Sequence, residues 1–132
     1  MTDRGPFIET SLGRPFYLLD PRPEDIDIRD IAHALSMQCR YTGHVSRYLS
    51  VAEHSINVSA IVPPEDALWG LLHDGSEAYC GDLSRPLKKC TPVGPPYLEI
   101  EARIMTAICA KFGLPETMPA SVHAADNAVL MA

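Results

Sequence analysis

The sequence lacks any apolar run near the roughly 20 residues that a membrane-spanning helix requires. Its first ten residues, MTDRGPFIET, contain no apolar stretch of the kind found in a signal peptide. Its four cysteines form no CxxC pair, so neither a zinc ribbon nor a thioredoxin-like redox pair is indicated, and we expect free thiols. These absences together favour a cytoplasmic protein that does not act at a membrane.

Basic residues are also scarce. Lysine and arginine total 11 against 17 acidic residues, which gives a formal net charge of -6 and a pI near 5.2. This balance argues against a nucleic-acid polymer as a partner, because binding to a phosphate backbone relies on clustered basic residues. A small phosphorylated ligand needs only a local basic pocket and stays compatible with the composition.

The chain has the length and composition of one helical domain, with 132 residues of which 46% are hydrophobic. Residues 1–23 contain four prolines and predict an irregular N-terminal arm, in which Phe16–Leu19 offer at most one short strand. Residues 24–132 form the predicted all-α domain, and residues 83–96, rich in proline, predict a long surface loop. The expected helices cover residues 24–36, 50–62, 66–80, 98–112 and 121–132.

Two of the expected helices begin with residues that favour capping. Ser50 opens an S-x-x-E capping box that Glu53 completes, and Ser121 is the candidate cap of the last helix. Gly81 and Gly113 supply the expected stops of the third and fourth helices.

Three groups suited to metal binding or proton transfer meet in the third expected helix. His73 and Asp74 directly follow the run LWGLL, and Glu77 lies three or four residues further on, on the same helical face. Such groups are costly in an apolar setting unless something pairs with them, and a divalent cation would do so. For an isolated His-Asp pair, a histidine hydrogen-bonded in the core is the simpler interpretation, so the neighbouring motifs decide.

Those motifs resemble the HD-domain phosphohydrolases, which share an H…HD…D ligand set. His54 stands in SVAEHS, His73 and Asp74 in LLHDGSEAYCGDLSRPLK, and Asp126 in HAADNAVL. The string HDxSExxxGDLxxPLK is similar to that of the bacterial 5'-deoxynucleotidase branch and its phage-like relatives. The segment DIAHALSMQCRYTGHVSRYLSVAEHS extends the likeness, which covers residues 27–132.

The resemblance implies an HD-type bundle of about five or more helices with a metal site between them. It implies one divalent ion, Mn, Co, Fe or Mg, bound by His54, His73, Asp74 and Asp126.

Other residues of the motifs have roles in catalysis and substrate binding within the family. Glu77 matches the acid that handles the attacking water, and Asp82 matches a carboxylate near the sugar and the leaving-group oxygen. Arg40 takes the place of an arginine that approaches the phosphate. Lys88 and His44 are further candidates for substrate binding.

The expected activity is release of phosphate from nucleoside 5'-monophosphates, chiefly deoxynucleotides. Two alternatives stay open. One is an HD hydrolase that acts on a cyclic nucleotide, a triphosphate or an alarmone, and the other is a catalytically silent metal or nucleotide sensor. Glu77 argues against the sensor, which needs no water-handling carboxylate. Family members usually continue with helical sequence after the last aspartate, whereas this chain ends six residues after Asp126. A short or truncated chain and a homodimer both stay open.

Overall fold

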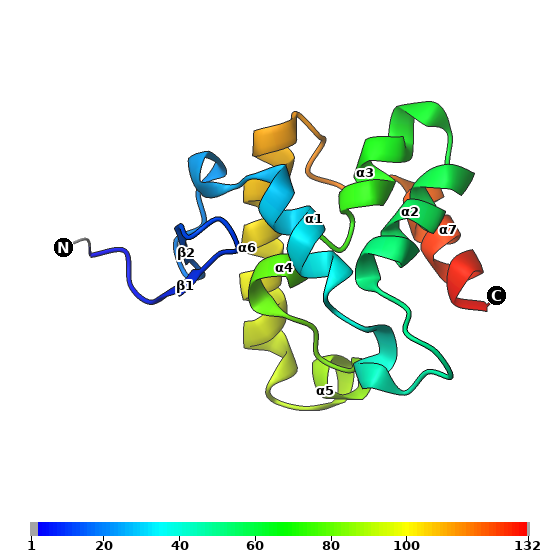
Figure 1. Ribbon diagram of the computed structural model, residues 1–132, viewed down its shortest axis with the longest axis horizontal. Coiled ribbons are helices and arrows are strands. Elements are labelled where there is room, and N and C mark those ends of the chain that lie inside the picture. The colour runs from blue at the N-terminus through cyan, green and yellow to red at the C-terminus, as the bar shows by residue number, and fades with distance from the viewer. Residues whose placement is uncertain (1–2, 132) are drawn as a thin grey trace.

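Helices make up most of the chain in the computed structural model, which describes residues 3–131 (Figure 1). The helices are α1 (Ile28–Ser36), α2 (Val51–Ile61), α3 (Ala67–Leu72), α4 (Glu77–Cys80), α5 (Arg85–Cys90), α6 (Gly94–Phe112) and α7 (Ala120–Met131). Three short 3₁₀ helices are η1 (Pro23–Asp25), η2 (Arg40–Gly43) and η3 (Pro64–Asp66). The helical class is therefore confirmed, and no helix of the described residues has the length and apolar character needed to span a membrane.

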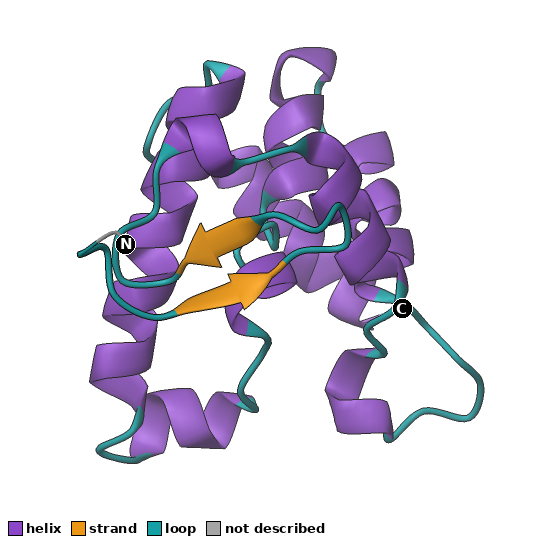
Figure 2. Ribbon diagram, turned by 60° about the vertical axis from the view of Figure 1, so that its left-hand side comes forward, coloured by secondary structure: helices purple, strands orange, loops and turns teal. Residues whose placement is uncertain are grey.

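The N-terminal segment contains a β-hairpin, so the prediction of an irregular arm without a strand pair was wrong. Strands β1 (Phe7–Glu9) and β2 (Pro15–Tyr17) are antiparallel, with Ile8 opposite Phe16 (Figure 2). Phe16 is fully buried, and its ring stacks on Tyr79 of α4 with 3.8 Å between the centroids. A strand of three residues is too short to show a clear alternation of apolar and polar residues in the sequence. Its stability comes from this tertiary packing.

The first two long helices begin where a side chain caps them. Helix α1 begins at Ile28 and not at Glu24, because the Asp27 carboxylate accepts a hydrogen bond from the Arg29 backbone N–H. For α2 the predicted start is confirmed: Ser50 Oγ accepts from the Glu53 N–H at 3.0 Å.

The third predicted helix is divided into α3 and α4 by the turn at residues 73–76. A Cβ atom on Gly75 would lie 3.0 Å from the Leu72 carbonyl oxygen and 3.2 Å from Ile108 Cδ1 of α6. The glycine therefore allows this turn to pack closely against α6. Helix α4 ends as expected at Gly81, which has a φ of 70°.

Residues 83–96 are largely helical, so the predicted surface loop was wrong. Pro86 lies in the first turn of α5, and Pro95 and Pro96 lie in the first turn of α6, where a missing N–H costs no helical hydrogen bond. A Cβ atom on Gly94 would lie 1.8 Å from the Lys88 carbonyl oxygen, so the α5–α6 junction requires glycine. Helix α6 ends at Gly113, as expected, with a φ of 68°.

Helix α7 begins at Ala120, so Ser121 is not its cap. The backbone N–H of Val122 bonds instead to the Pro119 carbonyl. Ser121 Oγ donates to the Asp66 carboxylate at 2.5 Å, which links the start of α7 to η3.

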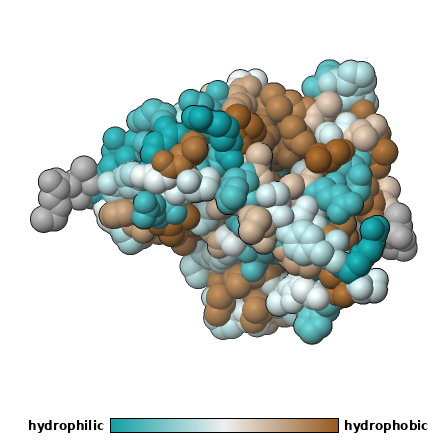
Figure 3. All heavy atoms as spheres, viewed as in Figure 1, coloured by the Kyte–Doolittle hydropathy of each residue, from teal (hydrophilic) through white to brown (hydrophobic). Residues whose placement is uncertain are grey.

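Two packed clusters divide the interior, and α2, α3 and α6 contribute to both. One lies mainly among the hairpin, α1, α4 and α6 and includes Phe16, Leu72 and Ile104, whereas the other lies mainly among α2, α3 and α7 and includes Val58 and Trp69. Figure 1 shows these two groups of helices on opposite sides of the molecule. Hydrophobic side chains also gather on the surface where α5 and the start of α6 lie (Figure 3).

Candidate metal centre

Helices α2 and α3 pack closely because a glycine faces the backbone of α2. A Cβ atom on Gly70 would lie 3.3 Å from Ser59 Cα and 3.4 Å from Ser59 N. This approach brings His54 of α2 next to His73 at the end of α3, with 5.2 Å between the ring centroids and 60° between the rings.

The four predicted ligands come together at this point. His54 Nε2 lies 2.7 Å from Asp126 Oδ1 of α7 and 3.7 Å from Asp74 Oδ2. His73 Nε2 lies 3.2 Å from Asp74 Oδ2 and 3.3 Å from Asp126 Oδ1. Two imidazole nitrogens and two carboxylate oxygens from separate parts of the chain therefore face one another.

The donor atoms suit a metal ion. His73 Nδ1 donates to the Gly70 carbonyl oxygen at 2.6 Å, an arrangement that directs Nε2 toward the carboxylates. Although two carboxylate oxygens lie nearby, buried His73 Nε2 has no hydrogen-bond partner of good geometry. His54, His73 and Asp74 form a cluster that could hold a metal ion, and Asp126 lies beside it.

The carboxylates give this cluster a strong affinity for positive charge. Burial lowers the pKa of His73, but the carboxylates of Asp126 and Asp74 raise it by more, to about 10. The hydrogen bond from His54, and then the nearby imidazole of His73, hold the pKa of Asp126 well below its usual range. Without an ion, the carboxylates therefore favour the protonated imidazole of His73.

Glu77 is a further buried acid beside the cluster. Burial first, then the charges of Asp74 and Asp82, raise its pKa to about 10. The sequence placed Glu77 next to Asp74 on one continuous helix. The helix is interrupted, yet the two stay close, because successive turns continue through residues 73–76 and the Glu77 N–H bonds to the Asp74 carbonyl at 3.0 Å.

Asp82 and Lys88 form an ion pair outside the ligand cluster. Lys88 Nζ lies 2.8 Å from Asp82 Oδ1, 3.9 Å from Glu101 Oε2 and 5.7 Å from the Tyr97 ring centroid. The Asp82 side chain is about half exposed, whereas that of Lys88 is mostly buried. The structure thus brings these two predicted substrate residues to each other and records no direct contact with the four ligands.

Arg40 and His44 lie at the two ends of η2. The Arg40 guanidinium lies over the Tyr41 ring, 4.9 Å from its centroid, and His44 is exposed. Tyr41 and Thr42 have φ angles of 56° and 54°, in the left-handed region that costs energy for residues other than glycine. Neither Arg40 nor His44 has a recorded contact with the four ligands in the described part of the chain.

A cavity of about 430 Å³ separates η2 from the segment after α4. It is lined by Gln38, Cys39, Thr42, Gly81 and Asp82. The cavity is large enough for part of a nucleotide, and one wall carries Asp82.

Gln38 is a site residue that the sequence did not reveal. Its Nε2 donates to the Glu77 carbonyl oxygen at 2.9 Å, so the segment leading to η2 is joined to α4. Gln38 belongs to the SMQCRYTGH string of the resemblance, but a glutamine has no signature that marks such a contact. Gly70 was also missed, since a glycine in a helical pattern is only a weak sign of close packing.

Comparison with known proteins finds two bacterial relatives, and no family model matches the chain. The chain is 43% identical over 124 residues to the uncharacterized protein YfdR of Escherichia coli K12, covering 94% of this chain and 68% of the relative. It is 38% identical over 125 residues to the uncharacterized protein RCAP_rcc00048 of Rhodobacter capsulatus, covering 88% and 63%. The chain thus spans about two thirds of the length of each relative. By this similarity, the chain belongs to the same family as YfdR.

Proposed function

We propose that the protein is a metal-dependent phosphohydrolase of the HD type that releases phosphate from nucleoside 5'-monophosphates, with deoxynucleotides preferred. The main support is the buried Nε2 of His73, which lacks a hydrogen bond although two carboxylates and a second imidazole face it. A buried polar atom without a partner is costly, and a cation between these four groups would remove that cost.

His54, His73, Asp74 and Asp126 would hold one divalent ion. Their mixed nitrogen and oxygen donors, without a thiolate, favour Mn, Co, Fe or Mg over a structural zinc. When bound, such an ion acidifies water and offsets negative charge on phosphoryl oxygens. Binding would displace the proton that the carboxylates otherwise hold on His73.

Glu77 is the residue we assign to the attacking water. Its burial and its negative neighbours favour the protonated form in the metal-free state. A nearby cation would favour the carboxylate form, which can orient a water molecule and accept its proton. The Gln38 amide, bonded to the Glu77 carbonyl oxygen, fixes the backbone at this position.

The cavity between η2 and Asp82 is the proposed place of the nucleotide. The guanidinium of Arg40 would bind phosphate oxygens through its planar set of donors, with His44 as a further contact. Asp82 would accept a hydrogen bond from the sugar 3'-hydroxyl, and Lys88, 2.8 Å away, orients this carboxylate. A closely packed wall near the sugar would exclude a 2'-hydroxyl, so deoxynucleotides should react faster.

A phosphate-release screen tests this proposal directly. The wild-type protein, loaded in turn with Mn, Co, Fe or Mg, is assayed against 5'-dNMPs, 5'-NMPs, 3'-dNMPs, cyclic nucleotides, triphosphates and alarmones. We expect the highest kcat/KM for 5'-dNMPs and no activity in His73→Ala. Equal rates on ribo- and deoxyribonucleotides would remove the deoxy preference. Nucleotide binding without phosphate release from any substrate would favour a sensor and contradict the proposed enzyme.

A further inference from the structure

A second, smaller cavity lies between the hairpin, α1 and α4, away from the four metal ligands. Its volume is about 140 Å³. The polar part of the lining consists of Glu9, Thr10 and Ser11 of the hairpin, Asp30 and His33 of α1, and Tyr79 of α4. The side chains of Ile8, Ala34 and Ala78 supply apolar wall.

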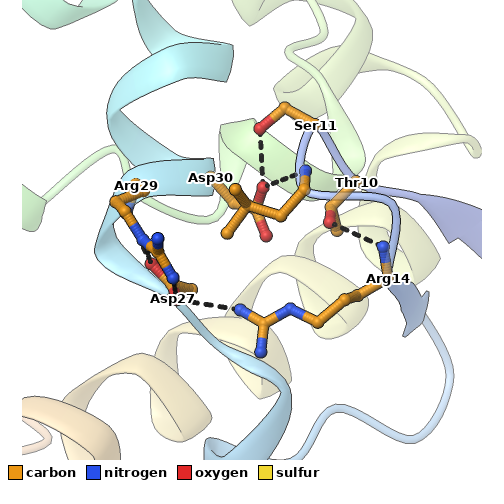
Figure 4. Close-up of polar contacts among 7 residues, drawn as sticks. Thr10, Ser11, Arg14, Asp27, Arg29 and Asp30 are labelled. Atoms are coloured by element: carbon orange, nitrogen blue, oxygen red, sulfur yellow. Dashed lines mark hydrogen bonds and ion pairs between the residues drawn. The ribbon is translucent and has the colours of Figure 1, made fainter.

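Asp30 is a buried carboxylate with one unused oxygen. Only 3% of the surface of Asp30 is exposed to solvent. Oδ1 accepts a hydrogen bond from Ser11 Oγ at 2.6 Å (Figure 4). It also accepts one from the Leu12 N–H at 3.0 Å. Oδ2 is also buried but has no hydrogen-bond partner. The hairpin turn therefore supplies hydrogen-bond donors to Oδ1 of Asp30 and none to Oδ2.

The nearby arginines form their ion pairs with Asp27 and not with Asp30. Arg14 and Arg29 each place an NH2 group 2.9 Å from Asp27 Oδ2, one helical turn before Asp30 (Figure 4). Asp27 is the more accessible of the two acids, yet it takes both guanidinium groups. In the described part of the chain, no basic side chain forms an ion pair with Asp30, although buried charges are ordinarily paired.

The hydroxyl of Tyr79 is a second unsatisfied group in the same cavity lining. Tyr79 is only 5% exposed, and its hydroxyl has no hydrogen-bond partner of good geometry. Its ring is fixed by stacking on Phe16. Burial and the charge of Asp30 raise the pKa of Tyr79, so the hydroxyl stays neutral and offers an oxygen lone pair.

We propose that this cavity binds a small monovalent cation, with Asp30 Oδ2 as the counter-charge and the hydroxyls of Tyr79 and Thr10 as additional oxygen ligands. The chemical class is an ammonium group or an alkali ion, because oxygen donors line the site and such cations can make direct contact with a carboxylate oxygen. The apolar wall from Ile8, Ala34 and Ala78 suits the methyl group of a primary amine. The site shares no ligand with the metal centre and does not depend on the proposed phosphohydrolase activity.

Titration of the full chain, followed by ¹H–¹⁵N NMR, tests the site. Methylammonium, potassium and tetramethylammonium chlorides are compared at one pH and one ionic strength. We expect saturable shifts at the amides of Ser11, Leu12 and Tyr79 with methylammonium, and no such response to tetramethylammonium, which has no N–H to donate to Asp30 Oδ2 and whose methyl groups keep its charge from direct contact with this oxygen. Saturation by methylammonium alone identifies an amine site, and saturation by potassium as well identifies a general monovalent-cation site. Weak, linear and equal responses to all three salts would overturn the proposal.

Matched variants locate the binding. Asp30→Asn removes the charge and should weaken binding by about tenfold or more, whereas Glu24→Gln makes the same charge change at an exposed residue and should leave binding unchanged. Tyr79→Phe retains the stacked ring and removes only the hydroxyl, so it provides the test if Asp30→Asn does not fold. We expect several-fold weaker binding by Tyr79→Phe. If the variants that fold, Asp30→Asn or Tyr79→Phe or both, bind methylammonium as tightly as the wild type, the assignment of the cation site is contradicted.

Discussion

The acidic side chains near the N-terminus and those near His73 have different partners. Asp20 and Asp27 each lie 2.9 Å from two arginine side chains. Asp74 and Asp126 lie instead against two imidazole side chains that are each only 2% exposed.

The difference separates acids that serve the fold from acids that are available for a ligand. Arginine stays protonated in proteins, so the pairs of Asp20 and Asp27 are complete without any other ion. A histidine carries a charge only while it holds a proton, and a metal ion can take the place of that proton on His73. The cluster of Asp74 and Asp126 is therefore suited to exchanging one cation for another.

The largest expected effect is at Glu77, beside the second group of acids. Glu77→Gln keeps the shape of the side chain and removes its ability to accept a proton, so phosphatase activity should fall by about 10²–10⁴-fold. Metal stoichiometry, measured by elemental analysis, should not change. Asp27→Asn is the matched control in the first group and should keep full activity. Wild-type turnover by metal-loaded Glu77→Gln would show that this carboxylate is only structural.

The two groups should also differ in their response to pH. The folded, metal-free protein raises the pKa of His73 from 6.5 to about 10, so this stabilisation is complete below pH 6.5 and is lost as the pH rises through about 10. The pKa of Glu77 is raised from 4.5 to about 10, so this residue also makes the free energy of unfolding fall as the pH rises.

Urea unfolding of chelator-treated protein between about pH 6.5 and 10 measures this effect. The free energy of unfolding should fall steadily across this range, and a saturating divalent metal should reduce the fall. Asp20, whose pKa its arginines lower, contributes no change in that range. A metal-free stability that stays constant or rises toward pH 10 would contradict the assigned charges.

A smaller effect on activity, but a large one on stability, is expected at the hairpin. Phe16→Ala empties a fully buried position and should cost about 3–5 kcal/mol of unfolding free energy. Phe7→Ala, on the same hairpin but 58% exposed, should cost much less. The folded fraction of both variants should bind metal normally, as measured by titration calorimetry. Selective loss of metal affinity in folded Phe16→Ala would show that the two regions are not independent.

The smallest effect is expected at Asp27. Asparagine also caps helices well, so Asp27→Asn retains the start of α1 and removes only the charge facing Arg14 and Arg29. The melting temperature should fall slightly at low salt and match the wild type at high salt, because exposed ion pairs are screened. A large decrease that persists at high salt would indicate a role beyond the ion pairs.

The sequence predicted the cluster better than the fold around it. The sequence brought out His54, His73, Asp74 and Asp126 because their motif is recognised from residue types. That recognition does not depend on the exact bounds of the helices. The interruption after Leu72 was missed because it depends on the close contact of Gly75 with Ile108, which are far apart in sequence.

The proline-rich segments were harder to interpret for a similar reason. A proline in the first turn of a helix is tolerated, whereas the same residue further along breaks it, so composition alone does not separate α5 from a loop. The hairpin depends on the stacking of Phe16 on Tyr79, a contact that no local pattern encodes.

Metal content is the measurement that tests the central claim most directly. The wild-type protein, His73→Ala and Asp27→Asn are purified, incubated with Mn or Co, freed of excess metal and examined by elemental analysis. The wild type and Asp27→Asn should retain about one divalent ion per chain, and folded His73→Ala should retain almost none, since it loses the buried ligand nitrogen. A metal-free wild type after reconstitution, or equal retention by His73→Ala, would contradict the assignment of this cluster as a metal centre.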